Sequence, residues 1–130
     1  MIVTDASVLL EVLLRTPAGA QIEERILDPL ESLHAPHLLD LEIAQVLRRY
    51  AQRGEISAER GRTCLELLGQ FPLQRYAHEP FIPRIWSLRA NLTAYDAAYV
   101  ALAEGLRVTL LTRDARLAGA PGNSAKIELI

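Results

Sequence analysis

Cysteine is almost absent from this sequence, in which Cys64 is the only one. A single cysteine excludes an internal disulfide and cannot form a zinc site by itself. Long apolar runs are also absent, since none approaches the roughly 20 residues that a membrane-spanning helix needs. Residues 1–5 contain none of the basic side chains that begin a secretory signal. We therefore expect a cytoplasmic protein that does not cross a membrane.

Lysine is the second scarce residue, because Lys126 is the only lysine beside thirteen arginines. The formal net charge of −2 argues against a uniformly basic nucleic-acid binder. Arginine suits phosphate recognition, since its planar guanidinium donates two hydrogen bonds at once. A compositional bias of the source genome is, however, the simpler explanation for this preference.

The length and composition are those of one folded domain. The chain has 130 residues, of which 50% are hydrophobic and 23% charged, and this balance excludes disorder. A chain of this length buries roughly two-thirds of its unfolded surface around a single core. It contains no internal repeat, low-complexity tract or linker, so we predict one domain over residues 1–130.

Short apolar runs alternate along the chain with segments of helical periodicity. The predicted strands are 2–4, 32–36, 73–77 (an edge strand), 108–112 and 126–130. The predicted helices are 5–14, 17–29, 37–53 (opened by Pro36), 57–69, 80–91 and 93–105 (ended by Gly105), with a helical turn at 113–119. This alternation predicts an α/β fold, in which a short central parallel sheet is flanked by helices on both faces.

Two aspartates follow predicted strands. Asp5 comes directly after the strand 2–4, and Asp114 follows the strand 108–112 with one residue, Arg113, in between. Helix capping explains either residue alone. The carboxyl ends of parallel strands meet at one edge of the sheet, where open α/β sheets bind their ligands. We therefore expect both carboxylates at that edge.

A third aspartate, Asp96, lies in an otherwise apolar helix. Every other residue from Ala94 to Ala103 is apolar or aromatic. A helix that is apolar on all faces is normally buried, and a buried carboxylate is costly without a partner. A helix cap is one explanation, because the spacing from Thr93 to Asp96 fits a capping box. The N-terminus of this helix also lies near the carboxyl end of the strand that follows it, which places Asp96 at the same edge.

Glu42 is the fourth acidic candidate. It lies at the border of the apolar face of the helix 37–53, and within this helix alone a solvent-exposed pair with Arg49 is the favoured explanation. Several carboxylates in one site could not all ionise without a cation, so at least one pKa should be raised. Oxygen ligands suit Mg²⁺ or Mn²⁺ and not Zn²⁺, and the three histidines show no metal-ligand spacing with the cysteine.

Four segments resemble the PIN domain in order and spacing: MIVTDAS, APHLLDLEIAQVL, LTAYDAAYVALAE and LLTRDARLA. Among the branches of that family the chain is most similar to the VapC-type toxin ribonucleases of bacterial toxin–antitoxin pairs, over essentially its whole length. The acidic quartet of the family falls on Asp5, Glu42, Asp96 and Asp114. Its small hydroxyl residues fall on Ser7 and Thr112. Gln45 stands where many relatives have asparagine, and it lies outside the quartet.

The resemblance implies an endoribonuclease that hydrolyses RNA with Mg²⁺ or Mn²⁺ as cofactor. Glu42 would hold a water or act as a base. Three acids would bind the metal: Asp5, Asp96 and Asp114. Two hydroxyl residues would orient carboxylates or waters: Ser7 and Thr112. Three arginines near the acids are candidates to contact RNA phosphates, although they would fit equally well as solvated surface residues: Arg89, Arg113 and Arg116.

The resemblance also implies a homodimer and a VapB-type antitoxin partner. More leucines occur in the first four predicted helices than a small sheet needs, and these favour a dimer: Leu9, Leu13, Leu14, Leu65, Leu67 and Leu68. Two alternatives stay open. One is a non-catalytic PIN-like module that binds RNA or protein. The other is a phosphoacceptor of receiver or haloacid-dehalogenase type, but Ser7 stands where dehalogenases need a second acid.

Overall fold

A five-stranded parallel sheet forms the centre of the fold, with its strands in the order β3-β2-β1-β4-β5. The computed structural model describes all 130 residues. The strands are β1 (Ile2–Thr4), β2 (Leu33–Pro36), β3 (Leu73–Tyr76), β4 (Thr109–Thr112) and β5 (Ile127–Leu129). The predicted α/β fold with a parallel sheet is confirmed, and the segment 73–77 does form an edge strand.

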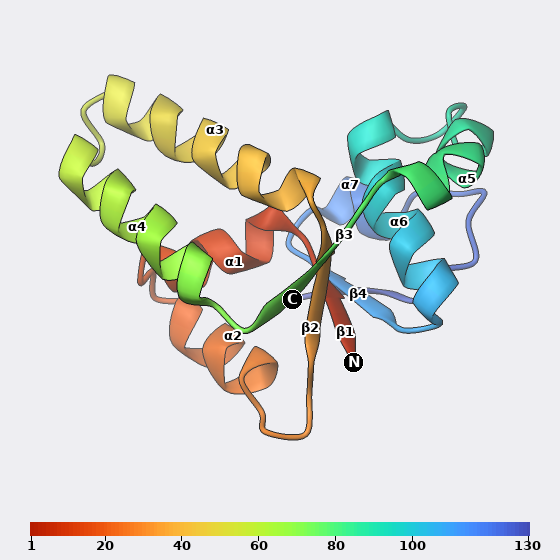
Figure 1. Cartoon of the computed structure of the whole chain (residues 1–130), viewed down its shortest axis with the longest axis horizontal. Coiled ribbons are helices and arrows are strands. Elements are labelled where there is room, and N and C mark those ends of the chain that lie inside the picture. The colour runs from red at the N-terminus through yellow and green to blue at the C-terminus, as the bar shows by residue number, and fades with distance from the viewer.

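Helices cover both faces of this sheet (Figure 1). On one side lie α1 (Ala6–Leu13), α2 (Gly19–Ile26), α3 (Leu38–Gln52) and α4 (Ala58–Gln70). On the other side lie α5 (Ile82–Ser87), which follows the short 3₁₀ helix η1 (Glu79–Phe81), and α6 (Ala94–Leu106). The helical turn α7 (Ala115–Ala118) follows β4. None of these helices combines the length and the apolarity needed to cross a membrane.

The helix α6 is the most deeply buried helix of the fold. Seven consecutive residues, Ala97–Ala103, are buried, so every face of this part of the helix is covered. The helix packs on β1, β2 and β4 with one side and against α5 with another. A helix without a polar face is stable only when enclosed in this way. The burial predicted for 94–103 is confirmed for 97–103, whereas Ala94 and Tyr95 are exposed and Asp96 is half-buried.

Several helix boundaries differ from those predicted. The helices predicted over 17–29 and 80–91 are shorter, as α2 (Gly19–Ile26) and α5 (Ile82–Ser87), and two other differences have a clear cause. Pro36 closes β2 and does not open the helix, which begins at Leu38. The helix α6 continues through Gly105 and ends at Leu106, because Arg107 takes the left-handed conformation, with φ at 58°, that a glycine was expected to supply. The glycine serves packing instead, since a Cβ at position 105 would lie 2.9 Å from the ring of Phe81.

The expectation that six leucines form a surface excess is wrong for three of them. Leu9, Leu13 and Leu68 are core residues, because α1 and α4 use these positions to cover the sheet and each other. Leu65 and Leu67 on α4 do stay partly exposed. The apolar surface left for a partner on this side is therefore smaller than the sequence indicates.

Candidate active site

The register of the two central strands brings the first and last acids together. Thr4 of β1 pairs with Leu111 of β4, so the residues that follow both strands lie at one edge of the sheet. The Thr112 hydroxyl donates a hydrogen bond to the Asp5 carboxylate there. Thr112 is fully buried, and Asp5 is nearly so. The pairing of β1 with β4 is therefore sufficient to place these two side chains next to each other.

Asp5 is held by donors from three directions. It caps α1 in an extended backbone conformation, and its carboxylate accepts the Val8 N–H at 3.2 Å. The Ser7 hydroxyl donates to the same oxygen at 2.5 Å, and Thr112 donates to the other. Burial raises the pKa of Asp5, and these hydrogen bonds lower it only in part. The cap predicted for this position is present, and it is combined with a place in the site.

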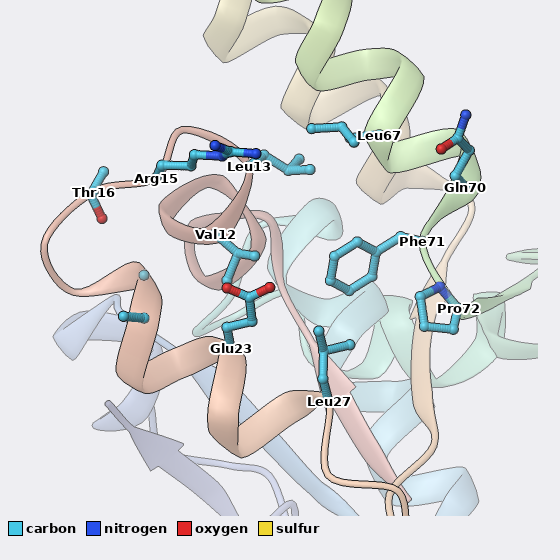
Figure 2. A pocket seen from close by; sticks show the side chains of 12 residues that line it. Val12, Leu13, Arg15, Thr16, Glu23, Leu27, Leu67, Gln70, Phe71 and Pro72 are labelled. Atoms are coloured by element: carbon cyan, nitrogen blue, oxygen red, sulfur yellow. The ribbon is translucent and has the colours of Figure 1, made fainter.

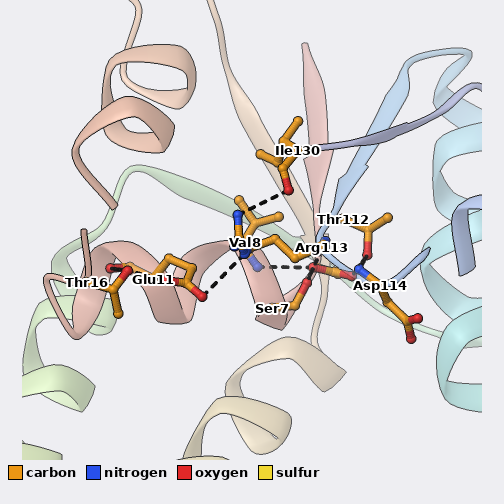
Figure 3. Close-up of polar contacts among 9 residues, drawn as sticks. Ser7, Val8, Glu11, Thr16, Thr112, Arg113, Asp114 and Ile130 are labelled. Atoms are coloured by element: carbon orange, nitrogen blue, oxygen red, sulfur yellow. Dashed lines mark hydrogen bonds and ion pairs between the residues drawn. The ribbon is translucent and has the colours of Figure 1, made fainter. Parts of the chain in front are cut away.

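Ser7 and Thr112 also tie the loop after β4 to the site, as Figure 3 shows. The Ser7 hydroxyl accepts the Arg113 N–H at 2.9 Å, and the Thr112 hydroxyl accepts the Asp114 N–H at 3.0 Å. Each hydroxyl thus donates to Asp5 and accepts from a backbone amide of the same loop. The position of Asp114 relative to Asp5 is fixed by these two bridges.

Glu42 has a partner that the sequence did not indicate. The buried Tyr99 of α6 donates its hydroxyl to Oε1 of Glu42 at 2.5 Å, and no pair with Arg49 forms. Burial raises the pKa of Glu42, the Tyr99 hydrogen bond lowers it, and the charges of Asp96 and Asp5 raise it again. The pKa of Tyr99 is raised by its own burial and by Glu42, so the phenol stays a neutral donor.

The helix α3, which carries Glu42, is anchored at its first residues by hydrogen bonds to the end of β3 and to the residues that follow it. The Leu38 N–H, at the start of α3, donates to Nε2 of His78 at 3.0 Å, and the His37 N–H donates to the Tyr76 carbonyl. These bonds satisfy amides that the first turn of a helix leaves free. His78 is thus a structural histidine, in agreement with its lack of metal-ligand spacing.

Asp96 stands in the first turn of α6 and is only half-buried. The Thr93 hydroxyl accepts the Asp96 N–H at 3.1 Å, so Thr93 caps the helix. Burial raises the pKa of Asp96, the Asp114 charge raises it further, and Arg116 and Thr93 lower it. The cap is therefore only half of the capping box that the spacing predicts. The Asp96 amide takes part in it, whereas the Asp96 carboxylate accepts no backbone amide and belongs to the acidic group.

Asp114 differs from the other three acids in its charge environment. It caps α7, and its carboxylate accepts the Arg116 N–H at 2.9 Å while the Arg116 guanidinium lies 3.5 Å away. Burial acts to raise the pKa of Asp114, but the hydrogen bonds and charge of Arg116 outweigh it, and the pKa is lowered. Asp114 is thus the acid most firmly ionised in the absence of a cation.

All four acids line one cavity of about 600 Å³ at the carboxyl edge of the sheet. Their electrostatic coupling is seen in the pKa of Glu42, raised by Asp96 and Asp5, and in that of Asp96, raised by Asp114. No three acidic, histidine or cysteine side chains converge closely enough, as they lie, to form a metal site. The donor set nevertheless fits a hard divalent cation, because it consists of carboxylate oxygens around one water-accessible space.

The three arginines expected near phosphates lie in different settings. The Arg113 guanidinium is occupied by the Ile130 carbonyl at 3.1 Å and by Glu11 at 3.3 Å (Figure 3). Arg89 stacks on the Trp86 ring, 4.6 Å from its centroid, and does not line the cavity. Arg116 is 93% exposed beside Asp114. The arginine that lines the cavity is Arg49 of α3.

A second cavity, of about 650 Å³, lies between α1, α2 and the end of α4 (Figure 2). Its walls carry Val12, Leu27, Leu67 and Phe71, and Glu23 is the only acid that lines it. A lone carboxylate gives no basis for the acid chemistry considered above. The cavity at the carboxyl edge of the sheet, which is lined by all four acids, is therefore the candidate active site.

The chain matches known proteins over nearly its whole length. The family model of the PIN domain matches residues 2–123. Ribonuclease VapC12 of Mycobacterium tuberculosis is 42% identical over 130 residues, which cover 100% of this chain and 99% of that protein. Ribonuclease VapC9 of the same organism is 48% identical over 117 residues, covering 90% and 88% of the two chains.

The fold recurs in solved structures at much lower identity. A toxin–antitoxin complex from Klebsiella pneumoniae superposes with a TM-score of 0.65 at 20% identity, over 93% of each chain. Identity at that level shows the fold alone, whereas the family match and the VapC relatives extend over nearly the whole sequence. The chain therefore belongs to the PIN-domain family, as a homologue of the VapC toxins.

Proposed function

We propose that the chain is a Mg²⁺- or Mn²⁺-dependent endoribonuclease, the toxin of a toxin–antitoxin pair. The main support is that four carboxylates from separate segments line one cavity in a VapC homologue. Its relatives at 42–48% identity carry the name ribonuclease. The raised pKa values of Asp5, Glu42 and Asp96 further support it, because a group of acids that resists ionisation gains from a bound cation.

Each residue has a stated task in this reaction. The chemistry that Mg²⁺ or Mn²⁺ supplies when bound is positive charge at the scissile phosphate and at the attacking water. Glu42 holds the water and accepts its proton, since its raised pKa makes it a better base than an ordinary glutamate. Ser7 and Thr112 hold Asp5 in one orientation. Three carboxylates would hold the ion: Asp5, Asp96 and Asp114.

The test is cleavage of RNA by the purified chain with and without a chelator. Activity should require Mg²⁺ or Mn²⁺, and Asp5→Asn or Asp96→Asn should lower it by at least about 100-fold while the fold stays intact. Asp28→Asn, an exposed loop aspartate outside the cavity, is the matched control and should keep full activity. Cleavage that persists in chelator or in both site variants would refute the proposal.

The same assay decides against a non-catalytic binding module. That alternative draws support from the lack of three converging ligands in the structure. It predicts that RNA or protein is bound but that no RNA is cut at any metal concentration. Metal-dependent cleavage lost in Asp5→Asn would exclude it.

Partners follow from the same assignment. A toxin–antitoxin complex among the structural neighbours supports a cognate VapB-type antitoxin for this chain. A homodimer is supported more narrowly, by the partly exposed Leu65 and Leu67 on α4. Sedimentation at micromolar concentration tests the dimer, and a monomer there would contradict it.

A further inference from the structure

The acid-lined cavity is only half polar. Seven of its fourteen lining residues are hydrophobic, and the polar half already includes all four acids. Hydrolysis of a phosphodiester bond makes use of carboxylates, a cation and water, and has no need of an apolar wall. The apolar half of the cavity is therefore available to contact a part of the RNA other than the phosphate.

Two large side chains at this wall are exposed. Tyr95 of α6 is 64% exposed, and Leu41 of α3 is 74% exposed. Leu41 belongs to α3 and Tyr95 to α6, which lie on opposite sides of the sheet (Figure 1), and both residues line the cavity. Leu38 of α3 lines the cavity as well, on the side of Leu41. The cavity thus has an aromatic side and an aliphatic side above its acids.

Tyr95 stands directly beside an acid of the site. It precedes Asp96 in the first turn of α6, so the two side chains project from adjacent positions of one helix. The other tyrosine of the cavity, Tyr99, is buried and donates to Glu42. Tyr95 is consequently the one aromatic ring of the cavity that a ligand can cover.

We propose that Tyr95 stacks on an unpaired nucleobase next to the scissile phosphate, with Leu38 and Leu41 packing against the other face of the base. This inference rests on the proposed ribonuclease function and names the part of the RNA that the apolar wall receives. A base is the apolar, planar part of a nucleotide, and stacking on an aromatic side chain is a common mode of single-strand binding. A base held inside a duplex does not expose its face, so the RNA must be unpaired at this nucleotide.

The first experiment measures kcat and KM on a short unstructured oligoribonucleotide that the wild type cuts at a mapped bond. Tyr95→Ala should lower kcat/KM about 10- to 100-fold, and Tyr95→Phe, which keeps the stacking ring, should stay within about twofold of wild type. Trp86→Ala is the matched control, because Trp86 is 67% exposed and lies outside the cavity. Equal activity of Tyr95→Ala and wild type would overturn the inference, as would an equal loss in Trp86→Ala.

The second experiment identifies the base. An abasic nucleotide beside the cut bond should slow the wild type at least as much as Tyr95→Ala does, because it also removes the contacts of Leu38 and Leu41. It should slow Tyr95→Ala by a smaller factor than it slows the wild type, because the contact between ring and base cannot be lost twice. If the loss of kcat/KM from the abasic nucleotide multiplies with the loss from Tyr95→Ala, the Tyr95 ring and the base do not contact each other.

The third experiment is independent of catalysis. In an Asp5→Asn background, an oligonucleotide carrying 2-aminopurine should bind with quenched fluorescence, and the added Tyr95→Ala should weaken binding and relieve the quenching. If the chain with Asp5 intact cuts no RNA while quenching in Asp5→Asn still depends on Tyr95, the stacking site is retained and the ribonuclease is refuted. Absence of binding would refute the stacking site. The variants Tyr95→Ala and Leu41→Ala should sediment with the same mass as the wild type. A changed mass would show that these residues form an interface between copies of the chain, and would overturn the inference.

Discussion

Replacing Tyr99 by phenylalanine removes one hydroxyl and leaves the ring in place. That hydroxyl donates to Oε1 of Glu42 at 2.5 Å, from a side chain that is 1% exposed. A hydrogen bond to a charged group contributes about 1.5–3 kcal/mol, and a neutral one about 0.5–1.5 kcal/mol. The ring still fills its space, so no cavity is created. At pH 7.5 we expect the free energy of unfolding to fall by about 1.5–3 kcal/mol.

The loss should depend on pH in a direction set by Glu42. Burial raises the pKa of Glu42 above 4.5 in the folded chain, so Glu42 stabilises the fold only when protonated, and this contribution fades as pH rises through its raised pKa. The Tyr99 hydroxyl opposes that trend, since it lowers the pKa. Without it the pKa rises further. The difference between variant and wild type should therefore be small at pH 4 and full at pH 7.5.

Urea unfolding in chelator, at pH 4 and pH 7.5, measures both differences. The control is the same substitution in a Glu42→Gln background, where no carboxylate is present and the loss should stay at about 0.5–1.5 kcal/mol at both values of pH. An equal loss at both values of pH, or an undiminished loss in the Glu42→Gln background, would refute the assigned pairing. The acidic limb of the pH–rate profile should also move to higher pH in Tyr99→Phe, because it reports the proposed base.

Two further predictions concern stability. In chelator, Asp5→Asn should raise the melting temperature, because burial raises the pKa of Asp5 and makes its ionised form unfavourable in the folded chain. The same variant should be stabilised less by added Mn²⁺. A lower melting temperature together with undiminished stabilisation by Mn²⁺ would contradict the acidic site. Gly19→Ala should cost about 1–3 kcal/mol in urea unfolding, because its Cβ would collide with the backbone carbonyl oxygen of Glu11 in α1. Gly69→Ala should raise the free energy of unfolding by about 0.5–1 kcal/mol, because Gly69 lies within α4 and a Cβ there would meet open space. Equal effects of the two substitutions would show that α2 does not approach α1 as closely as the structure has it.

The parts of the site that the sequence predicted follow from local rules. Asp5 and Asp114 could be placed because a residue after a parallel strand lies at the ligand-binding edge whatever else the chain does. Asp96 could be placed because a helix that precedes a strand begins near the carboxyl end of that strand. The strands, their parallel direction and the edge position of 73–77 followed from the same alternation.

The parts that could not be predicted depend on side-chain packing between distant elements. Tyr99 and Glu42 are 57 positions apart, and no spacing rule connects a tyrosine of one helix with a glutamate of another. Arg113 looked like a phosphate ligand because it adjoins Asp114, but its guanidinium turns to Glu11 and to the end of the chain. Sequence proximity gives the position of a backbone and leaves the direction of a long side chain undetermined.

The order of the strands has a consequence for how the chain is made. β1 lies at the centre of the sheet and receives its second neighbour only when β4 arrives, so the contact between Thr112 and Asp5 spans 107 positions. At about 5–20 residues per second, Asp5 is synthesised roughly 5–20 s before the last acid. The site therefore stays unassembled on a growing chain. Any activity that needs all four acids in one cavity must therefore wait until translation is nearly finished.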